Sequence, residues 1–105
     1  MEAKNMLEAE EQAFRQKVLD SFFENGKLKA MPVKRKKRLI VLEEILSRFE
    51  YDKVYKEKEV NAIIVDVFDD YCTIRREMIE ERLMERSRDG DGYWRRKAGE
   101  TIAGA

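Results

Sequence analysis

Apolar residues recur every three or four positions in four stretches of this chain, a spacing typical of helices that bury one face. The four stretches cover about residues 3–24, 33–48, 57–68 and 71–83. Beyond them, residues 83–88 and 93–97 alternate between apolar and polar positions around two Asp-Gly steps at 89–92, which predicts a β-hairpin. We therefore expect four helices followed by a hairpin.

The end of the first helix is marked by Asn25 and Gly26, because both residues tolerate the left-handed backbone conformation that closes a helix. Residues 27–31 then read as a short extended segment, which Pro32 ends. Two interpretations of the first helix stay open. Its apolar stripe packs on the domain, or its early part makes a helix–helix contact in a homodimer.

The third and fourth helices are separated by a short break at Asp69 and Asp70, and Asp70 is well suited to cap the fourth helix. Residues 51–55, ahead of the third helix, read as a loop or a short strand. Two short helices joined by a tight turn and followed by a hairpin are the outline of a winged helix-turn-helix. The expected fold is therefore mainly α with a small β-hairpin, winged helix-turn-helix-like, with an added N-terminal helix. It forms one domain over residues 1–97, followed by a flexible tail at 98–105.

The spacing also selects the residues that should face the core. They are Leu39, Ile40, Val41, Leu42, Ile45, Leu46 and Phe49 in the second helix, Val60, Ile63, Ile64, Val67 and Phe68 in the third, and Ile74 and Met78 in the fourth. Tyr93 or Trp94 should anchor the hairpin on this core. Cys72 is expected to be a small packing residue rather than a reactive thiol.

Composition limits the class of protein. The chain has 105 residues, no histidine and a single cysteine, so neither a disulfide framework nor a structural zinc site is expected. No glycine-rich phosphate loop or nucleophile elbow is present, and we expect neither an enzyme nor a cofactor. No apolar run approaches the length of about 18 residues that spans a membrane, and no secretory signal is visible. These features favour a cytoplasmic protein.

Charge is balanced overall but unevenly distributed. The chain has 22 basic and 22 acidic residues. Residues 1–11 carry four acids and one lysine, whereas residues 27–42 carry seven bases and no acid, and residues 82–97 carry six bases and three acids. If the fold brings the two basic stretches together, they form one basic surface of the kind that binds nucleic acid.

The densest cluster of positive charge lies at the start of the second predicted helix. This basic run consists of Lys34, Arg35, Lys36, Lys37 and Arg38. A helix N-terminus carries partial positive charge and favours acidic residues, so the run is destabilising unless an anion compensates it. Backbone N–H groups at the same end would help to bind a phosphate. The alternative is a solvated basic face, paired with the acidic N-terminal helix.

Four segments carry a family resemblance. They are residues 26–39, 49–55 leading into 57–61, 70–77, and 92–95. In this order they resemble the uncharacterised bacterial domain-of-unknown-function family 2087, although Lys56 stands where that family usually has a hydroxyl residue. The resemblance implies a cytoplasmic bacterial domain, sometimes joined to helix-turn-helix regulators and described as transcription-regulator-like. It implies no established biochemical activity.

These observations favour a winged-helix transcriptional regulator whose partner is double-stranded DNA. Its fourth helix would enter the major groove and present Thr73, Arg75 and Arg76. Phosphate or minor-groove contacts would come from the hairpin and the basic run, through Arg86, Arg88, Arg95 and Arg96 and through Lys34, Arg35, Lys36, Lys37 and Arg38.

One feature of the fourth helix opposes DNA binding. Arg75 and Arg76 are surrounded by acids that repel phosphate, namely Asp69, Asp70, Glu77, Glu80 and Glu81. A protein-interaction or dimerisation module on the same fold, without DNA binding, is therefore the alternative. RNA binding and an unrecognised enzyme also stay open, although no aromatic stacking platform or carboxylate pair singles itself out.

Overall fold

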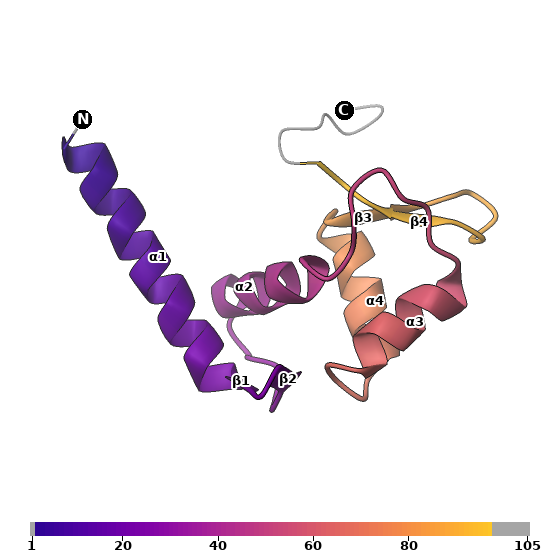
Figure 1. The fold of residues 1–105 in the computed structure, drawn as a ribbon, viewed down its shortest axis with the longest axis horizontal. Coiled ribbons are helices and arrows are strands. Elements are labelled where there is room, and N and C mark those ends of the chain that lie inside the picture. Colours follow the sequence, from indigo (N-terminus) through magenta and orange to yellow (C-terminus); the bar gives the residue numbers. More distant parts are fainter. Residues whose placement is uncertain (1, 98–105) are drawn as a thin grey trace. The chain divides into compact units, whose positions relative to one another are not determined.

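The fold is seen in a computed structural model that describes residues 2–97, with side chains described from residue 6 (Figure 1). In chain order the elements are α1 (Glu2–Phe22), β1 (Phe23–Glu24), β2 (Lys27–Leu28), α2 (Arg35–Leu46), α3 (Glu57–Val65), α4 (Tyr71–Glu80), β3 (Met84–Arg86) and β4 (Tyr93–Arg95). This order confirms a mainly helical chain with a C-terminal hairpin. The predicted tail at 98–105 lies outside the described residues.

The chain divides after Val41 into two compact units, so that the boundary falls within α2. The first unit contains α1, the β1–β2 pair and the start of α2. The second contains the end of α2 and every later element. The expectation of one domain over residues 1–97 stays a prediction.

The first helix ends earlier than its apolar spacing suggested. After Phe22 the chain enters a short hairpin, in which β1 pairs antiparallel with β2. Asn25 and Gly26 form its turn with φ angles of 54° and 79°, and two successive left-handed residues are what a tight two-residue hairpin requires. The prediction that a helix runs to residue 24 is therefore wrong, because the same dipeptide can end a helix or turn a hairpin.

Among the described side chains of α1, those that pack within the first unit lie in the second half of the helix. Val18 and Leu28 are buried, and the Lys36 ammonium lies 4.7 Å from the centre of the Phe14 ring. Met6 and Leu7, nearer the N-terminus, are 63% and 60% exposed. The apolar residues at the start of α1 therefore bury little of their surface within this unit.

The second helix begins two residues later and ends two residues earlier than predicted. Its buried residues are Ile40, Val41, Leu42, Ile45 and Leu46, and Phe49 is buried just beyond its end. Leu39 is only half-buried. The other six positions predicted to face the core are therefore confirmed.

The second unit is built around α3 and α4, which contact each other along a shared apolar face. Val60, Ile64, Val67, Ile74 and Met78 are buried there, as predicted. The two other predicted positions, Ile63 and Phe68, are only half-buried. The core of this unit thus follows the helical spacing closely.

Side-chain hydrogen bonds cap both of these helices. The Asp70 carboxylate accepts hydrogen bonds from the backbone N–H and the hydroxyl of Thr73, at 3.3 and 2.8 Å, which confirms the predicted cap. At the start of α3, the Glu59 carboxylate accepts a 2.8 Å hydrogen bond from the backbone N–H of Lys56. A lysine side chain has no acceptor, so the reverse bond that a hydroxyl residue would supply is missing at Lys56.

A left-handed residue ends α4 three positions before its predicted end. Arg82 has a φ angle of 61°. The backbone N–H of Arg82 bonds to the carbonyl of Ile79, and that of Leu83 bonds to the carbonyl of Met78. This pair of bonds is the Schellman arrangement that satisfies the last carbonyls of a helix. It turns the chain directly into β3.

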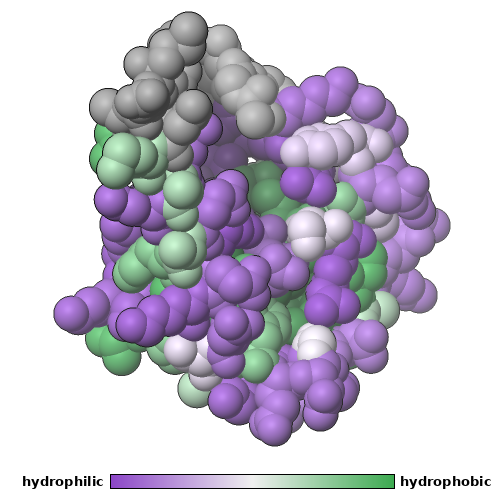
Figure 2. All heavy atoms as spheres, turned by 60° about the vertical axis from the view of Figure 1, so that its left-hand side comes forward, coloured by the Kyte–Doolittle hydropathy of each residue, from purple (hydrophilic) through white to green (hydrophobic). Residues whose placement is uncertain are grey.

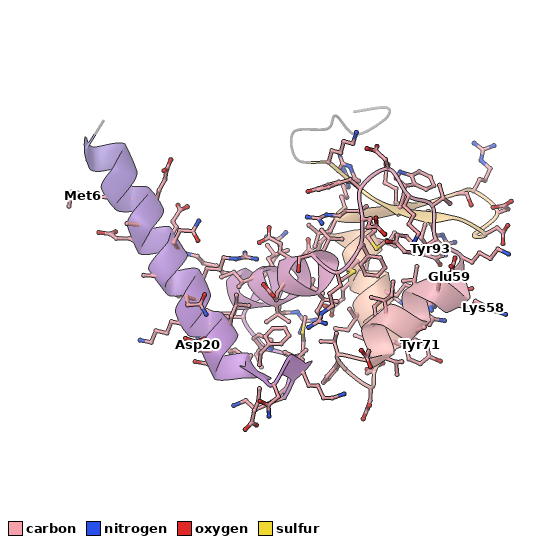
Figure 3. The ribbon with its side chains drawn as sticks, viewed as in Figure 1. Met6, Asp20, Lys58, Glu59, Tyr71 and Tyr93 are labelled. Atoms are coloured by element: carbon pink, nitrogen blue, oxygen red, sulfur yellow. The ribbon has the colours of Figure 1, made fainter. Side chains whose placement is uncertain are left out.

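Tyr93 holds the C-terminal hairpin on the second unit (Figure 3). In β4 its backbone exchanges hydrogen bonds of 2.7 and 2.8 Å with Tyr55, so the predicted loop or strand at 51–55 contributes one bridge residue. Tyr93 is 1% exposed and Tyr55 is 4% exposed, whereas Trp94 is partly exposed. Of the two predicted anchors, Tyr93 is therefore the one that is buried.

Loss of the Asp70 cap should weaken α4. We expect Asp70→Ala to lower the free energy of unfolding by about 1 kcal/mol, because two donors of Thr73 lose their acceptor. Urea unfolding followed by circular dichroism measures the change. Asp69→Ala removes the same charge one residue earlier and should shift the midpoint much less. Equal losses in the two variants would contradict the cap.

Candidate nucleic-acid interface

A pocket of about 130 Å³ opens between α4 and the β3–β4 hairpin. Its lining residues are Arg75, Arg76, Ile79, Glu80, Arg86 and Tyr93. Three arginines and one glutamate thus line the pocket together with two residues of apolar character, Ile79 and Tyr93. The structure therefore brings together three of the predicted DNA-binding residues, one of them from the hairpin.

Helical spacing explains the contribution of α4. Ile79 follows Arg75 by four positions and Arg76 by three, so the three side chains share one face of the helix. The opposite face carries the buried residues Ile74 and Met78. Burial of that face against α3 therefore leaves Arg76 exposed, whereas Arg75 is only half-buried beside α3.

Strand register explains the contribution of the hairpin. Arg86 lies directly opposite Tyr93, and Met84 lies directly opposite Arg95. Directly opposed residues share one face of a hairpin, so Arg86 and Arg95 lie on the same face as buried Met84 and Tyr93. Trp94 lies on the other face, where its indole N–H donates to the Glu85 carboxylate at 3.2 Å. Arg86 and Arg95, both predicted to contact DNA from the hairpin, therefore lie on the face that also carries its buried residues.

Arg75 is held in place by two residues of α3. Its guanidinium group forms a 3.1 Å ion pair with the Glu57 carboxylate and donates a hydrogen bond to the side-chain oxygen of Asn61. The Arg75 side chain is 19% exposed. Two of its nitrogen atoms are thus occupied within the protein, and much of its charge is offset.

The other residues of α4 that were predicted to contact DNA differ in how accessible they are to a ligand. Arg76 is exposed, and so is Glu80 one turn later. Thr73 is half-buried, and its hydroxyl donates to the Asp70 carboxylate. Because this bond is part of the helix cap, Thr73 is not positioned as a donor toward a ligand. Arg76 is the α4 residue best placed to contact one.

Arg95 and Arg96 stabilise the base of the hairpin. The Arg95 guanidinium lies 4.0 Å from the centre of the Tyr51 ring and donates a 3.1 Å hydrogen bond to the Phe49 carbonyl. Arg96 donates to the Arg82 carbonyl at 3.2 Å. These contacts give both arginines a structural role, which sequence spacing did not suggest.

Arg88 lies at the exposed tip of the hairpin, in a turn ordered by its neighbours. The hydroxyl of Ser87 donates to the Asp89 carboxylate at 2.6 Å, and the backbone N–H of Asp91 donates to it at 3.0 Å. The Ser87 bond, and then the Asp91 bond, hold the pKa of Asp89 below its usual value of 3.8. The tip therefore keeps an anionic carboxylate beside Arg88 at neutral pH.

The basic run belongs to the first unit, and its five members are not equivalent. Lys34, Arg35 and Lys36 are exposed, whereas Lys37 and Arg38 are half-buried. Arg38 donates a 3.1 Å hydrogen bond to the Pro32 carbonyl. Only the first part of the run is thus fully presented at the surface.

Cys72 is exposed on α4, so its predicted role as a packing residue is wrong. It lies three residues before Arg75 and two before buried Ile74. The helix rotates it away from the apolar face, which is the physical reason for the error.

Neither a metal-binding cluster nor a membrane-spanning helix is found in the part of the chain that the structure describes. Among the side chains described, from residue 6 to residue 97, no three or more Cys, Asp or Glu residues are grouped so that they would hold a metal ion. No helix in the same part of the chain has the length and apolar character needed to cross a bilayer.

Sequence reasoning missed the residues that position Arg75. Asn61 lies 14 positions away from it, and Glu57 lies further still. Neither local periodicity nor helix spacing relates residues on different helices. Glu57 lies in the acidic first turn of α3, which suits the N-terminus of that helix, but nothing in this pattern indicates an ion pair with α4.

Comparison with known proteins places residues 27–95 in one family. They match the family described as "Uncharacterized protein conserved in bacteria (DUF2087)", which confirms the resemblance seen in the sequence. The match extends from β2 to the last residue of β4 and leaves α1 outside. No curated protein and no solved structure matches the chain.

The two neighbouring arginines of the pocket should differ in their effect on stability. Arg75→Ala removes the bonds to Glu57 and Asn61 and should lower the free energy of unfolding by about 1–2 kcal/mol. Arg76→Ala, the matched control, should change it by less than about 0.5 kcal/mol. Urea unfolding measures both. Equal stabilities of the two variants would contradict the described role of Arg75.

Proposed function

We infer that this chain, which belongs to the bacterial family DUF2087, binds double-stranded DNA in the manner of a winged-helix transcriptional regulator. The observation that carries this proposal is the pocket in which Arg75, Arg76 and Arg86 converge from α4 and the hairpin. Family membership supplies no activity, so the proposal rests on the second unit's geometry.

The order of elements in the second unit supports the fold part of the proposal. The end of α2 is followed by the Tyr55 bridge, then by α3 and α4, and then by β3 and β4. Winged helix-turn-helix domains place a helix pair ahead of a hairpin in this way. In this assignment α4 is the recognition helix and the hairpin is the wing.

The chemistry of the pocket supports a phosphate ligand. A guanidinium group presents several N–H donors in a plane and pairs well with phosphate oxygens. Arg76 and Arg86 approach from two different elements, so a phosphate between them would be held from two directions. Arg75, fixed by Glu57 and Asn61, lines the pocket at a constant position but adds little net charge, because its ion pair with Glu57 offsets it.

The acids around α4 oppose phosphate binding less than their number suggests. Asp70 accepts two hydrogen bonds from Thr73, and Glu57 pairs with Arg75. Glu77 is half-buried and has its own interaction within the protein. Glu80 is the acid that lines the pocket itself, where Arg76 and Arg86 outnumber it even when Arg75, which is paired with Glu57, is left out. The local balance therefore favours an anion.

Binding to a mixed-sequence DNA duplex should depend on Arg76 and Arg86. Fluorescence anisotropy across a salt series measures both the affinity and its salt slope. We expect Arg76→Gln and Arg86→Gln each to weaken binding and to flatten the slope of log K against log salt by about one, the effect of losing one phosphate contact. Lys53→Gln removes an exposed positive charge outside the pocket and serves as the matched control.

Two outcomes would contradict this proposal. The first is the absence of binding by the folded native chain at low salt, which would favour a protein-interaction module on the same fold. The second is equal loss of affinity in all three variants, because general charge rather than the pocket would then attract DNA.

A further inference from the structure

We propose that the chain forms a homodimer in which the acidic start of α1 from one copy docks on the exposed part of the basic run in the other copy. Two surfaces of the first unit carry this inference. The acidic patch consists of Met6, Leu7, Glu8, Glu10 and Glu11, and the basic patch consists of Val33, Lys34, Arg35 and Lys36.

The acidic patch is an exposed helix face with apolar content. All of residues 6–11 are exposed, and Met6 and Leu7 are more than half accessible to solvent. In Figure 3, Met6 projects from the first turns of α1, well away from Asp20, which lies near the other end of the helix. Apolar residues are also exposed on the largely hydrophilic face shown in Figure 2. A helix of this kind is stabilised when its apolar residues are covered.

The basic patch is the chemical complement of the acidic one. Val33 is 93% exposed and directly precedes three exposed bases. These bases lie at the N-terminus of α2, whose first turn contains no acid. The helix dipole disfavours positive charge there and favours carboxylates. Three glutamates from another copy would supply the compensating negative charge, and Met6 or Leu7 would cover Val33.

The geometry of the first unit favours a second copy over the same chain as the partner. The contact of Lys36 with Phe14 fixes the basic run beside the middle of α1. Leu7 precedes Phe14 by seven residues, which corresponds to about 10 Å along the helix axis. Among the described residues, no ion pair links Glu8, Glu10 or Glu11 to the basic run. The start of the acidic patch therefore lies farther along α1 than the point where the basic patch of the same chain contacts this helix.

Both patches are present in every copy, so two copies form the contact twice. Such reciprocal pairing closes a dimer with two-fold symmetry and leaves neither patch exposed. This inference does not depend on the proposed function. It assigns the exposed part of the basic run to self-association, whereas the proposed DNA contact uses the second unit.

Sedimentation equilibrium of the native chain tests the dimer without any DNA. At a low ionic strength of about 50 mM we expect a mass approaching twice the monomer's 12.5 kDa. At about 1 M salt we expect dissociation, because screening then extends over only about 3 Å. A monomer at high concentration and low salt would overturn the proposal.

Two charge-reversed variants make the test specific. One carries Glu8→Lys, Glu10→Lys and Glu11→Lys, and the other carries Lys34→Glu, Arg35→Glu and Lys36→Glu. Each variant alone has two patches of like charge and should dimerise at least about tenfold more weakly than the native chain. Circular dichroism checks that each variant keeps its helices, since Lys and Glu have similar helix propensities.

An equimolar mixture of the two variants gives the decisive test of the proposed contact. In a mixed pair, each lysine-substituted α1 faces a glutamate-substituted run, and each native run faces a native α1. The mixture should therefore recover dimers that neither variant forms alone. Damage to folding cannot produce such recovery. Failure of the mixture to associate, while the native chain does, would assign the dimer to another surface and overturn the proposal.

Discussion

The pairing of Tyr55 with Tyr93 is the constraint on which the second unit depends. Two short backbone hydrogen bonds join these residues, both side chains are buried, and the Tyr55 ring packs edge-on against Phe49. The Tyr55 hydroxyl also accepts a 2.8 Å hydrogen bond from the backbone N–H of Glu50. A two-stranded hairpin is only marginally stable by itself. This pairing ties the hairpin to the segment that precedes α3 and thereby gives Arg86 a fixed position.

Arginines that lie close together in the second unit have different roles. Arg95 packs against Tyr51 and Phe49 and supports the hairpin, whereas Arg86, on the same face, lines the pocket. On α4, Arg75 is committed to Glu57 and Asn61, and adjacent Arg76 is exposed. Some of these arginines therefore stabilise the fold, and the others are candidate ligand contacts. The charge of a segment alone does not distinguish these two roles.

The sequence predicted those features that depend on local pattern. The Asp70 cap, the inward side of α4 and the Asp-Gly hairpin follow from spacing and turn chemistry within a few residues. The hairpin at Asn25 was missed because its turn residues also suit a helix end. The partners of Arg75 could not be predicted, because contacts between helices depend on how the helices pack. The roles of Arg95 and of exposed Cys72 required the same information.

The proposed DNA contact places a phosphate in the pocket between α4 and the hairpin. A titration of the isotope-labelled chain with duplex DNA, followed by NMR, tests it most directly because it reports each residue separately. We expect the largest shifts at Arg76, Ile79 and Arg86, with smaller changes at the hairpin tip. Shifts confined to residues 33–38, or no shifts in the folded protein at low salt, would contradict it.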